Sequence, residues 1–247
     1  MQRRPLKVIS LNVQLNQWRE RAASFLKKEQ ADAVCLQEVL ASDMPFWNEA
    51  CGVEGRFEPM AISETSFTKP FNLKKGDPFG VAVFSRLPAV FSAAYYCGAS
   101  GTVPTVKKSP LESSNRMVLS ATVSIEGATY TIGTTHFTWT PEGEADDRQR
   151  RDVVALLRAL ERFPDLILCG DFNAPRGWEI WNLIAEKYHD NIPARYDSSL
   201  DPNLHRVKGL KRMVDGFWST PEYQVSNVSL VSGVSDHQAV IGLVERR

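Results

Sequence analysis

The sequence predicts an α/β (α+β) fold in which two mixed β-sheets pack face to face with helices outside. Strand-like runs rich in Val, Ile, Phe and Tyr recur along the 247 residues. Stretches with helical apolar periodicity separate some of these runs. About ten strands are too many for one open sheet, so two packed sheets are the favoured arrangement.

The strands are expected at residues 7–13, 33–39, 80–86, 90–96, 116–125, 128–137, 165–170, 213–219, 223–231 and 238–244. The segment SIEGAT, residues 124–129, predicts a hairpin turn between the fifth and sixth of them. A Gly-containing connection of this length between two alternating runs favours antiparallel pairing of neighbours.

Three segments show the apolar spacing of a helix. The expected buried faces are Trp18, Ala22, Phe25 and Leu26; then Val153, Val154, Leu157 and Leu160; then Trp178, Trp181 and Ile184, or a face through Ile180. The second segment follows Asp146 and Asp147, whose negative charge suits a helix N-terminus. The tryptophans of the third are interpreted as core residues.

Composition and charge indicate an ordinary globular protein. Apolar residues make up 43% of the chain, charged residues make up 23%, and the formal net charge is zero. A neutral chain does not favour wholesale electrostatic binding to nucleic acid or membranes. We find neither a linker nor a repeat, and expect a single catalytic domain over residues 1–247, acting as a monomer.

The cysteines and the N-terminus suggest a cytoplasmic protein. Cys35, Cys51, Cys97 and Cys169 form no CxxC pair and are expected to be reduced. Polar residues interrupt the first 16 positions, so no signal peptide is expected there. No apolar run approaches the length of a transmembrane segment.

Loops are expected at residues 63–78, 98–110 and 201–212, and each carries Lys or Arg. These basic side chains either form solvated surface or surround a cleft and attract a polyanion. The basic loop residues are Lys69, Lys74, Lys75, Lys107, Lys108, Arg206, Lys208 and Lys211.

Polar residues gather at the ends of the predicted strands. They are Asn12, Glu38, His136, Asp171, Asn173, Asp215, Asp236 and His237. In an extended chain, Asp171 and Asn173 would point to the same side, and Glu38 would share a face with Val34 and Leu36. Burying so many ionisable groups is costly unless they pair or bind a cation.

Six ordered motifs, LNV, QE, TH, GDFN, VDGFW and SDH, span nearly the whole chain. In this order they resemble the endonuclease/exonuclease/phosphatase superfamily, which includes deoxyribonuclease I. The resemblance implies a four-layer α-β-β-α sandwich. It also implies divalent-metal-dependent hydrolysis of a phosphate ester by direct attack of water, without a covalent phosphoenzyme.

The resemblance also assigns a metal site and a water-activating group. Glu38 is the expected metal ligand, with Asn12 close by, and Asp236 either approaches a metal or positions its loop. Such oxygen ligands favour Mg²⁺ or Mn²⁺, in a site with one ion or two. Asp171 would orient or deprotonate the attacking water, and Asn173 would hold water or a phosphate oxygen.

Two histidines and an arginine complete the implied site. His237 would lie beside the scissile phosphate, with Asp215 fixing its tautomer. His136 would donate to the phosphate oxygens as negative charge develops. Arg116 would clamp the phosphate, or would be an ordinary surface residue.

Three hypotheses about activity stay open on the sequence alone. The first is a phosphodiesterase or phosphatase acting on a small or lipid-derived phosphate ester. The second is a nuclease acting on DNA or RNA. Thr135-His136-Phe137 and Asp215-Gly216 differ from the pattern of the DNA-repair branch and favour the histidine-bearing branches. A binding module without catalysis is the third, and the intact set of polar residues argues against it.

Overall fold

The computed structural model describes residues 4–64, 74–106 and 114–247. One sheet contains β1 (Leu6–Asn12), β2 (Ala33–Leu40), β3 (Gly55–Ser63), β4 (Pro78–Ser85), β6 (Thr105–Val106), β12 (Tyr223–Val231) and β13 (Ala239–Arg246). The other contains β5 (Ala89–Cys97), β7 (Arg116–Ile125), β8 (Ala128–His136), β9 (Ile167–Asp171), β10 (His189–Asp190) and β11 (Asp215–Ser219). The helices are α1 (Arg19–Glu29), α2 (Met44–Cys51), α3 (Asp147–Leu160) and α4 (Glu179–Ala185).

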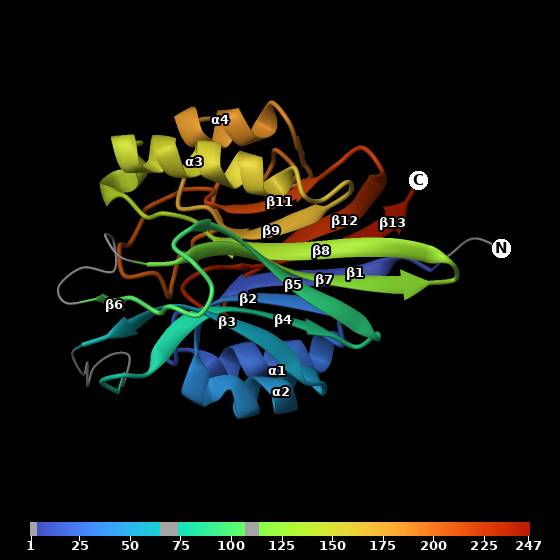
Figure 1. Cartoon of the computed structure of the whole chain (residues 1–247), viewed down its shortest axis with the longest axis horizontal. Helices are drawn as coiled ribbons and strands as arrows, with labels where there is room; N and C mark the ends of the chain where they lie inside the picture. Colours follow the sequence, from blue (N-terminus) through green and yellow to red (C-terminus); the bar gives the residue numbers. More distant parts are fainter. Residues whose placement is uncertain (1–3, 65–73, 107–113) are drawn as a thin grey trace.

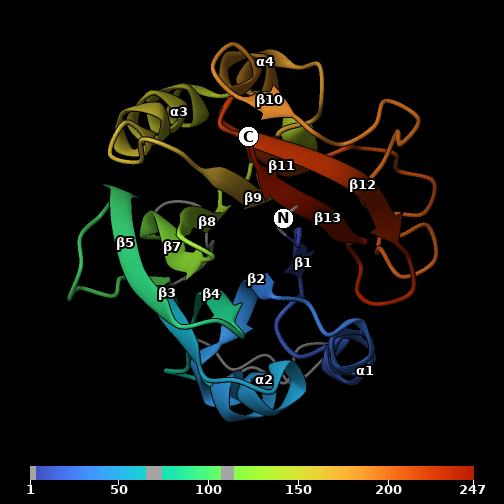
Figure 2. The same cartoon turned by 90° about the vertical axis from the view of Figure 1, so that its right-hand side faces the viewer.

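The two sheets pack face to face, with α1 and α2 outside one sheet and α3 and α4 outside the other (Figure 1). The strand orders are β12-β13-β1-β2-β4-β3-β6 and β10-β11-β9-β8-β7-β5. Both sheets are mixed, because β1 runs parallel to β2 and β8 runs parallel to β9. The four-layer sandwich predicted from the sequence is confirmed, and Figure 2 shows the layers end-on.

Alternation along β1 separates two parts of the core. Leu6 and Val8 join a cluster that also contains residues of β7, β8 and β9. Ile9 and Leu11 point the other way, into a cluster with residues of α1 and α2. The polar Asn12 at the end of β1 therefore follows Val8 toward the space between the sheets.

The structure corrects two of the expected helix faces. Along α3, the buried side chains include Val153, Leu156 and Leu160, whereas Val154 is 58% exposed. Leu157 is only half-buried. The buried positions recur every three or four residues along the helix, and Leu157 directly follows one of them, so it lies beside the buried face. In α4, Ile180, Trp181 and Ile184 are buried, but Trp178 precedes the helix and is 37% exposed, so its assignment to the core is wrong.

The sequence reasoning missed some elements. β3 contains Pro59, and its pairing with β4 shifts register between Pro59 and Ala61, which breaks the alternating pattern. The short α2 and the two-residue strands β6 and β10 gave no usable periodicity. The predicted loop 63–78 overlaps the last residue of β3 and the first residue of β4. Three of the basic loop residues, Lys69, Lys107 and Lys108, lie outside the described residues.

Two further observations concern the expected chemistry of the chain. All four cysteines are free, and Cys35, Cys51 and Cys169 are buried. Within the described ranges, none of the helices has both the length and the apolarity needed to span a bilayer.

Candidate active site

The topology brings the polar strand ends together at one end of the sandwich. Because β8 and β9 are parallel, His136 and Asp171 are register partners at their carboxyl ends. β11 is antiparallel to β9, so its first residue, Asp215, pairs with Asp171. Asn12 ends β1, and His237 lies just before β13, which runs antiparallel to β1.

A close approach of strands precedes the first carboxylate. Gly170 has a φ of 144°, and a Cβ atom there would lie 2.0 Å from the carbonyl oxygen of Thr135. No side chain fits in that space, which explains the glycine before Asp171 in the GDFN motif. The close contact fixes Asp171 beside His136.

A β-bulge directs Glu38 into the site. The pairing of β2 with β4 shifts register between Leu36 and Val39, and Glu38 adopts a left-handed backbone with a φ of 57°. Val34 and Leu36 point into the α1/α2 side of the core. The expectation that Glu38 shares their face is therefore wrong, because the extra residue of the bulge reverses the alternation.

Asn12 links the two sheets through two carboxylates. Its Nδ2 atom donates to Oε1 of Glu38 at 3.1 Å and to Oδ2 of Asp171 at 3.0 Å. Its Oδ1 atom accepts the backbone N–H of Gln14 at 3.0 Å. In this arrangement Asn12 orients Glu38 and Asp171. Both the nitrogen and the oxygen of its side-chain amide form hydrogen bonds within the protein.

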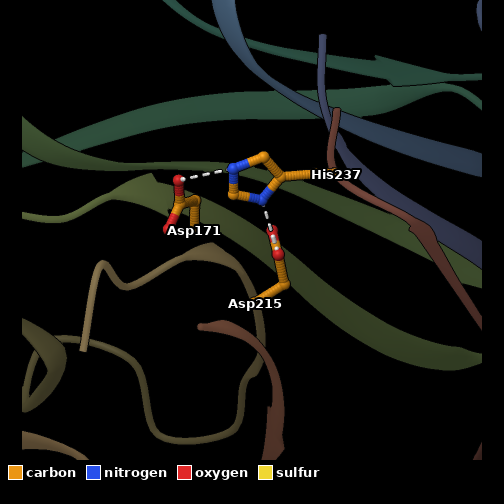
Figure 3. Close-up of side chains that lie close together, drawn as sticks. All are labelled: Asp171, Asp215 and His237. Atoms are coloured by element: carbon orange, nitrogen blue, oxygen red, sulfur yellow. Dashed lines mark hydrogen bonds and ion pairs between the residues drawn. The ribbon is translucent and has the colours of Figure 1, made fainter. Parts of the chain in front are cut away.

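His237 lies between two aspartates (Figure 3). Its Nδ1 atom is 2.7 Å from Oδ2 of Asp215, and its Nε2 atom is 3.8 Å from Oδ2 of Asp171. All three side chains are at most 10% exposed. Burial opposes protonation of His237, but the charges of Asp215 and Asp171 prevail and raise its pKa well above the usual value. The raised pKa favours the protonated ring, in which the Nδ1–H donates to Asp215.

His136 has the opposite charge state. Its Nε2 atom lies 3.6 Å from Oδ2 of Asp171 and 3.8 Å from Oε1 of Glu38. Burial, followed by the positive charges of Arg116 and His237, lowers its pKa well below the ordinary value. The imidazole is neutral at pH 7, and the nearby carboxylates favour the tautomer with the proton on Nε2.

Arg116 lies behind His136. It is 6% exposed, and its Nη1 atom donates to the carbonyl oxygens of His136 and Phe137 at 2.7 and 3.2 Å. Asn173 reaches the same segment, because its Nδ2 atom donates to the Phe137 carbonyl at 3.1 Å. Both side chains hold the backbone that carries His136.

Asn173 is not placed as an extended chain would place it. β9 ends at Asp171, and Asn173 has a left-handed φ of 50°. The backbone N–H of Asn173 donates to Oδ1 of Asp171 at 2.8 Å, which is the geometry of an Asx turn. The turn closes the strand and fixes the carboxylate at the same time.

The acidic groups of the candidate site repel one another. Burial first, and then the charge of Asp236, raise the pKa of Glu38 to about 7. Burial also raises the pKa of Asp171 to about 6, with Asp215 adding to the shift and His237 opposing it. Burial likewise raises the pKa of Asp236, against the opposing effect of His237. A divalent cation would relieve this repulsion.

The donor set near Glu38 fits a hard cation. Carboxylate oxygens are the ligands that Mg²⁺ and Mn²⁺ prefer, and Glu38 is the least buried of the site carboxylates, with 28% of its side chain exposed. Ligand atoms of Asp171, Asp215 and His237 also lie within 4.8 Å of one another. There the 2.7 Å contact between His237 and Asp215 is a hydrogen bond, so the Glu38 side of the cleft is the better cation site.

Two residues that the sequence reasoning did not single out support the site. Oγ of the buried Ser199 accepts the backbone N–H groups of Val214 and Asp215, both at 3.0 Å. Asp201 accepts the backbone N–H of Gly233 at 2.6 Å, and its own N–H donates to the carbonyl of Asp236. Nothing in the local sequence of either residue marks this role, because their partners are distant in the chain.

The chain can now be compared with known proteins. A model of the Endonuclease/Exonuclease/phosphatase family matches residues 9–237, so the chain belongs to this family. Members are generally divalent-metal-dependent, and the chain is a phosphoester hydrolase in this broad sense. A comparison with curated proteins finds no match.

Solved structures show the same fold. An endonuclease/exonuclease/phosphatase from Beutenbergia cavernae aligns with 99% of this chain and 72% of its own, at 18% identity and a TM-score of 0.75. The catalytic domain of human Nocturnin, solved with a bound sulfate anion, aligns over 100% and 95% at 21% identity and a TM-score of 0.69. A mannosyl-6-phosphatase from Bacteroides thetaiotaomicron aligns over 97% and 99% at 12% identity and a TM-score of 0.66.

Proposed function

We propose that the protein is a Mg²⁺- or Mn²⁺-dependent phosphodiesterase or phosphatase that hydrolyses its substrate by direct attack of water on phosphorus. The observation that carries this proposal is the arrangement of Asp171 between His237 and His136. A base, a cationic imidazole and a neutral imidazole meet there within 3.8 Å. The mannosyl-6-phosphatase among the structural neighbours fits the same chemistry.

Asp171 is the general base in this proposal. Its Oδ2 atom accepts from Nδ2 of Asn12 and lies near both histidines, and its Oδ1 atom accepts the N–H of Asn173. A pKa of about 6 keeps the carboxylate ionised at neutral pH and still able to accept a proton from water. Asn173 keeps the turn in place and contributes to holding the water or a phosphate oxygen.

The two histidines stabilise the charge that develops on the phosphoryl group. His237 would donate from Nε2, which lies 3.8 Å from Oδ2 of Asp171, to a phosphate oxygen. Asp215 holds the ring through Nδ1 and maintains its charge. His136 donates from Nε2, while Arg116 supports the backbone of His136 and Phe137.

Glu38 would hold the divalent ion, with Asp236 contributing nearby negative charge and Asn12 orienting the Glu38 carboxylate. When bound, the ion would polarise the phosphoryl oxygen and neutralise charge on the leaving oxygen. The four free cysteines fit a reducing compartment, so we place the enzyme in the cytoplasm. The chain acts as a single catalytic domain.

A substrate panel with Mg²⁺, Mn²⁺ or EDTA tests this function. Phosphate release from sugar phosphates, inositol phosphates and nucleotides is measured beside hydrolysis of bis(4-nitrophenyl) phosphate and nicking of a plasmid. The proposal predicts metal-dependent hydrolysis of at least one phosphate ester, and loss of that activity in Asp171→Ala. Full activity in EDTA would contradict it, and plasmid nicking that falls steeply with salt would assign a nuclease instead.

A further inference from the structure

A pocket of about 300 Å³ is lined by residues of the segment that follows Asn173 and of the segment that precedes Asp215. Its lining includes Pro175, Trp178, Tyr196 and Met213. None of the proposed site residues lines it. The pocket therefore offers a binding surface that the hydrolytic mechanism does not use.

The pocket is close to the reacting centre. The backbone N–H of Arg176 donates to the carbonyl of Met213 at 2.8 Å, and that of Phe172 donates to Val214 at the same distance. Met213 is two residues from Asp215, so their Cα atoms are at most about 7 Å apart. A residue that lines the pocket therefore lies close along the chain to the aspartate that holds His237.

The lining is cationic. Three cationic residues, Arg176, Lys211 and Arg212, line the pocket together with one carboxylate, that of Asp197. Arg176 is already occupied, because its guanidinium pairs with Asp190 at 2.8 Å and donates to the carbonyl of Ile192. Lys211 pairs with Asp197 at 2.8 Å in an exposed contact, and such contacts contribute little to stability.

Arg212 differs from the other two cations. No carboxylate in the described part of the chain forms an ion pair with it, and its Nε atom is buried without a hydrogen-bond partner there. Its Nη1 atom donates only to the carbonyl of Lys211, at 2.9 Å. The guanidinium instead lies over the ring of Trp178, 4.9 Å from the centroid. The aromatic face holds the cation in position while its charge stays unneutralised.

We propose that this Trp178–Arg212 pocket binds a second phosphate group of the substrate, next to the phosphate that is hydrolysed. The preferred substrate then carries at least two phosphates, as in a nucleotide chain or a polyphosphorylated sugar alcohol. The guanidinium of Arg212 can form two parallel hydrogen bonds to the oxygens of a phosphate. Lys211 can also contact this phosphate if its exposed ion pair with Asp197 opens. This inference rests on the proposed hydrolase function.

Pyrophosphate binding to the metal-free protein tests the pocket without catalysis. In EDTA no metal ion is available to bridge pyrophosphate to the carboxylates, and comparison of the wild type with Arg212→Ala by calorimetric titration reports on the pocket. Arg212→Ala should weaken binding about 10- to 100-fold, as expected for loss of hydrogen bonds to a charged group. Trp178→Ala should weaken it about two- to fivefold through loss of the cation–π contact.

Arg158→Ala is the matched control, because Arg158 is exposed in the last turn of α3. It should bind pyrophosphate as the wild type does. Arg212→Lys, which keeps the charge, should fall between the wild type and Arg212→Ala, and circular dichroism confirms that each variant is folded. Absence of binding to the wild type, or equal binding to Arg212→Ala, overturns the proposal.

Hydrolysis then shows whether the pocket selects substrates. The kcat/KM for a substrate with two phosphates is divided by that for bis(4-nitrophenyl) phosphate, and Arg212→Ala should lower this ratio at least about tenfold. Short oligonucleotides and inositol polyphosphates form separate arms that identify the source of the second phosphate. An unchanged ratio overturns the assignment to substrate. If no phosphate ester is hydrolysed at all, the proposed function is wrong. The pyrophosphate titration still shows whether the pocket binds phosphate.

Discussion

The Nδ1 atom of His237 lies 2.7 Å from Oδ2 of Asp215, and its Nε2 atom lies 3.8 Å from Oδ2 of Asp171. The hydrogen bond fixes which nitrogen points into the cleft and keeps the ring protonated. In the proposed mechanism, Asp215 is therefore a positioning residue that acts through His237. Removing its charge should affect the reaction more than the fold.

Asp215→Asn tests this relationship. We expect kcat to fall about 10²- to 10⁴-fold with a small change in KM, because an amide can hold the ring without stabilising its charge. The pKa of His237, followed by NMR of the imidazole protons, should fall toward its ordinary value. Glu54→Gln is the control, since Glu54 is exposed outside the site. Unchanged turnover, or a His237 titration like that of the wild type, would remove Asp215 from the proposed mechanism.

Asp171→Asn should abolish turnover for a different reason. The amide keeps the size of the side chain but cannot accept a proton from water, so we expect kcat to fall at least about 10²-fold. The repulsion around Glu38 also decreases, because Asp171 contributes to its raised pKa. Metal binding should therefore persist, and calorimetric titration with Mn²⁺ checks it. A variant that retains half of the wild-type kcat would contradict the role of the base.

Arg116 is expected to stabilise the backbone segment that carries His136. Its guanidinium donates to two carbonyl groups of the segment that carries His136. Arg116→Ala removes the Arg116 donor from both carbonyl groups, although Asn173 still donates to that of Phe137, so the free energy of unfolding should fall by about 1–3 kcal/mol. Urea denaturation measures this loss, with Arg158→Ala as a control that should stay within about 0.5 kcal/mol of the wild type. If Arg116 instead acts only by clamping phosphate, KM will rise while stability stays unchanged.

The strand-end pattern of the sequence predicted that most of the residues of the candidate site would lie close together. Asn12, His136, Asp171 and Asp215 each end or begin a strand, and the pairing of those strands follows from ordinary sheet topology. Strand ends that meet at one edge bring polar tips together even when the residues are far apart in sequence. The fold class and this gathering of residues were therefore accessible before the structure.

The orientation of Glu38 was not accessible in that way. Alternation along β2 puts it on the face of Leu36, and only the bulge against β4 turns it toward Asn12. A bulge depends on the partner strand, so the local sequence does not reveal it. The predicted orientation of Asn173 was wrong for a similar reason, because the chain leaves the extended conformation immediately after Asp171. Residues that depend on a distant partner need the three-dimensional structure.

Glu38→Gln should separate metal binding from folding. At pH 7.5, saturating Mg²⁺ or Mn²⁺ should raise the melting temperature of the wild type, because ligand binding to the folded state stabilises it. The increase should be much smaller in Glu38→Gln, and the metal concentration for half-maximal activity should rise at least about tenfold. Differential scanning fluorimetry and activity titrations measure the two effects. Superimposable metal titrations of variant and wild type would show that Glu38 is not the ligand.

The metal-free protein should also show the cost of ionising Glu38. Burial and the charge of Asp236 raise its pKa from 4.5 to about 7, so the folded state binds a proton that the unfolded state releases. The free energy of unfolding should therefore decline as the pH rises from about 4.5 to 7. Since Gln cannot ionise, Glu38→Gln should be more stable than the wild type in EDTA at pH 8, by about 1–3 kcal/mol. The difference should vanish at pH 4, as urea denaturation at each pH will show. Glu54→Gln should show no such pH dependence, and a constant gap between Glu38→Gln and wild type would refute the assigned repulsion.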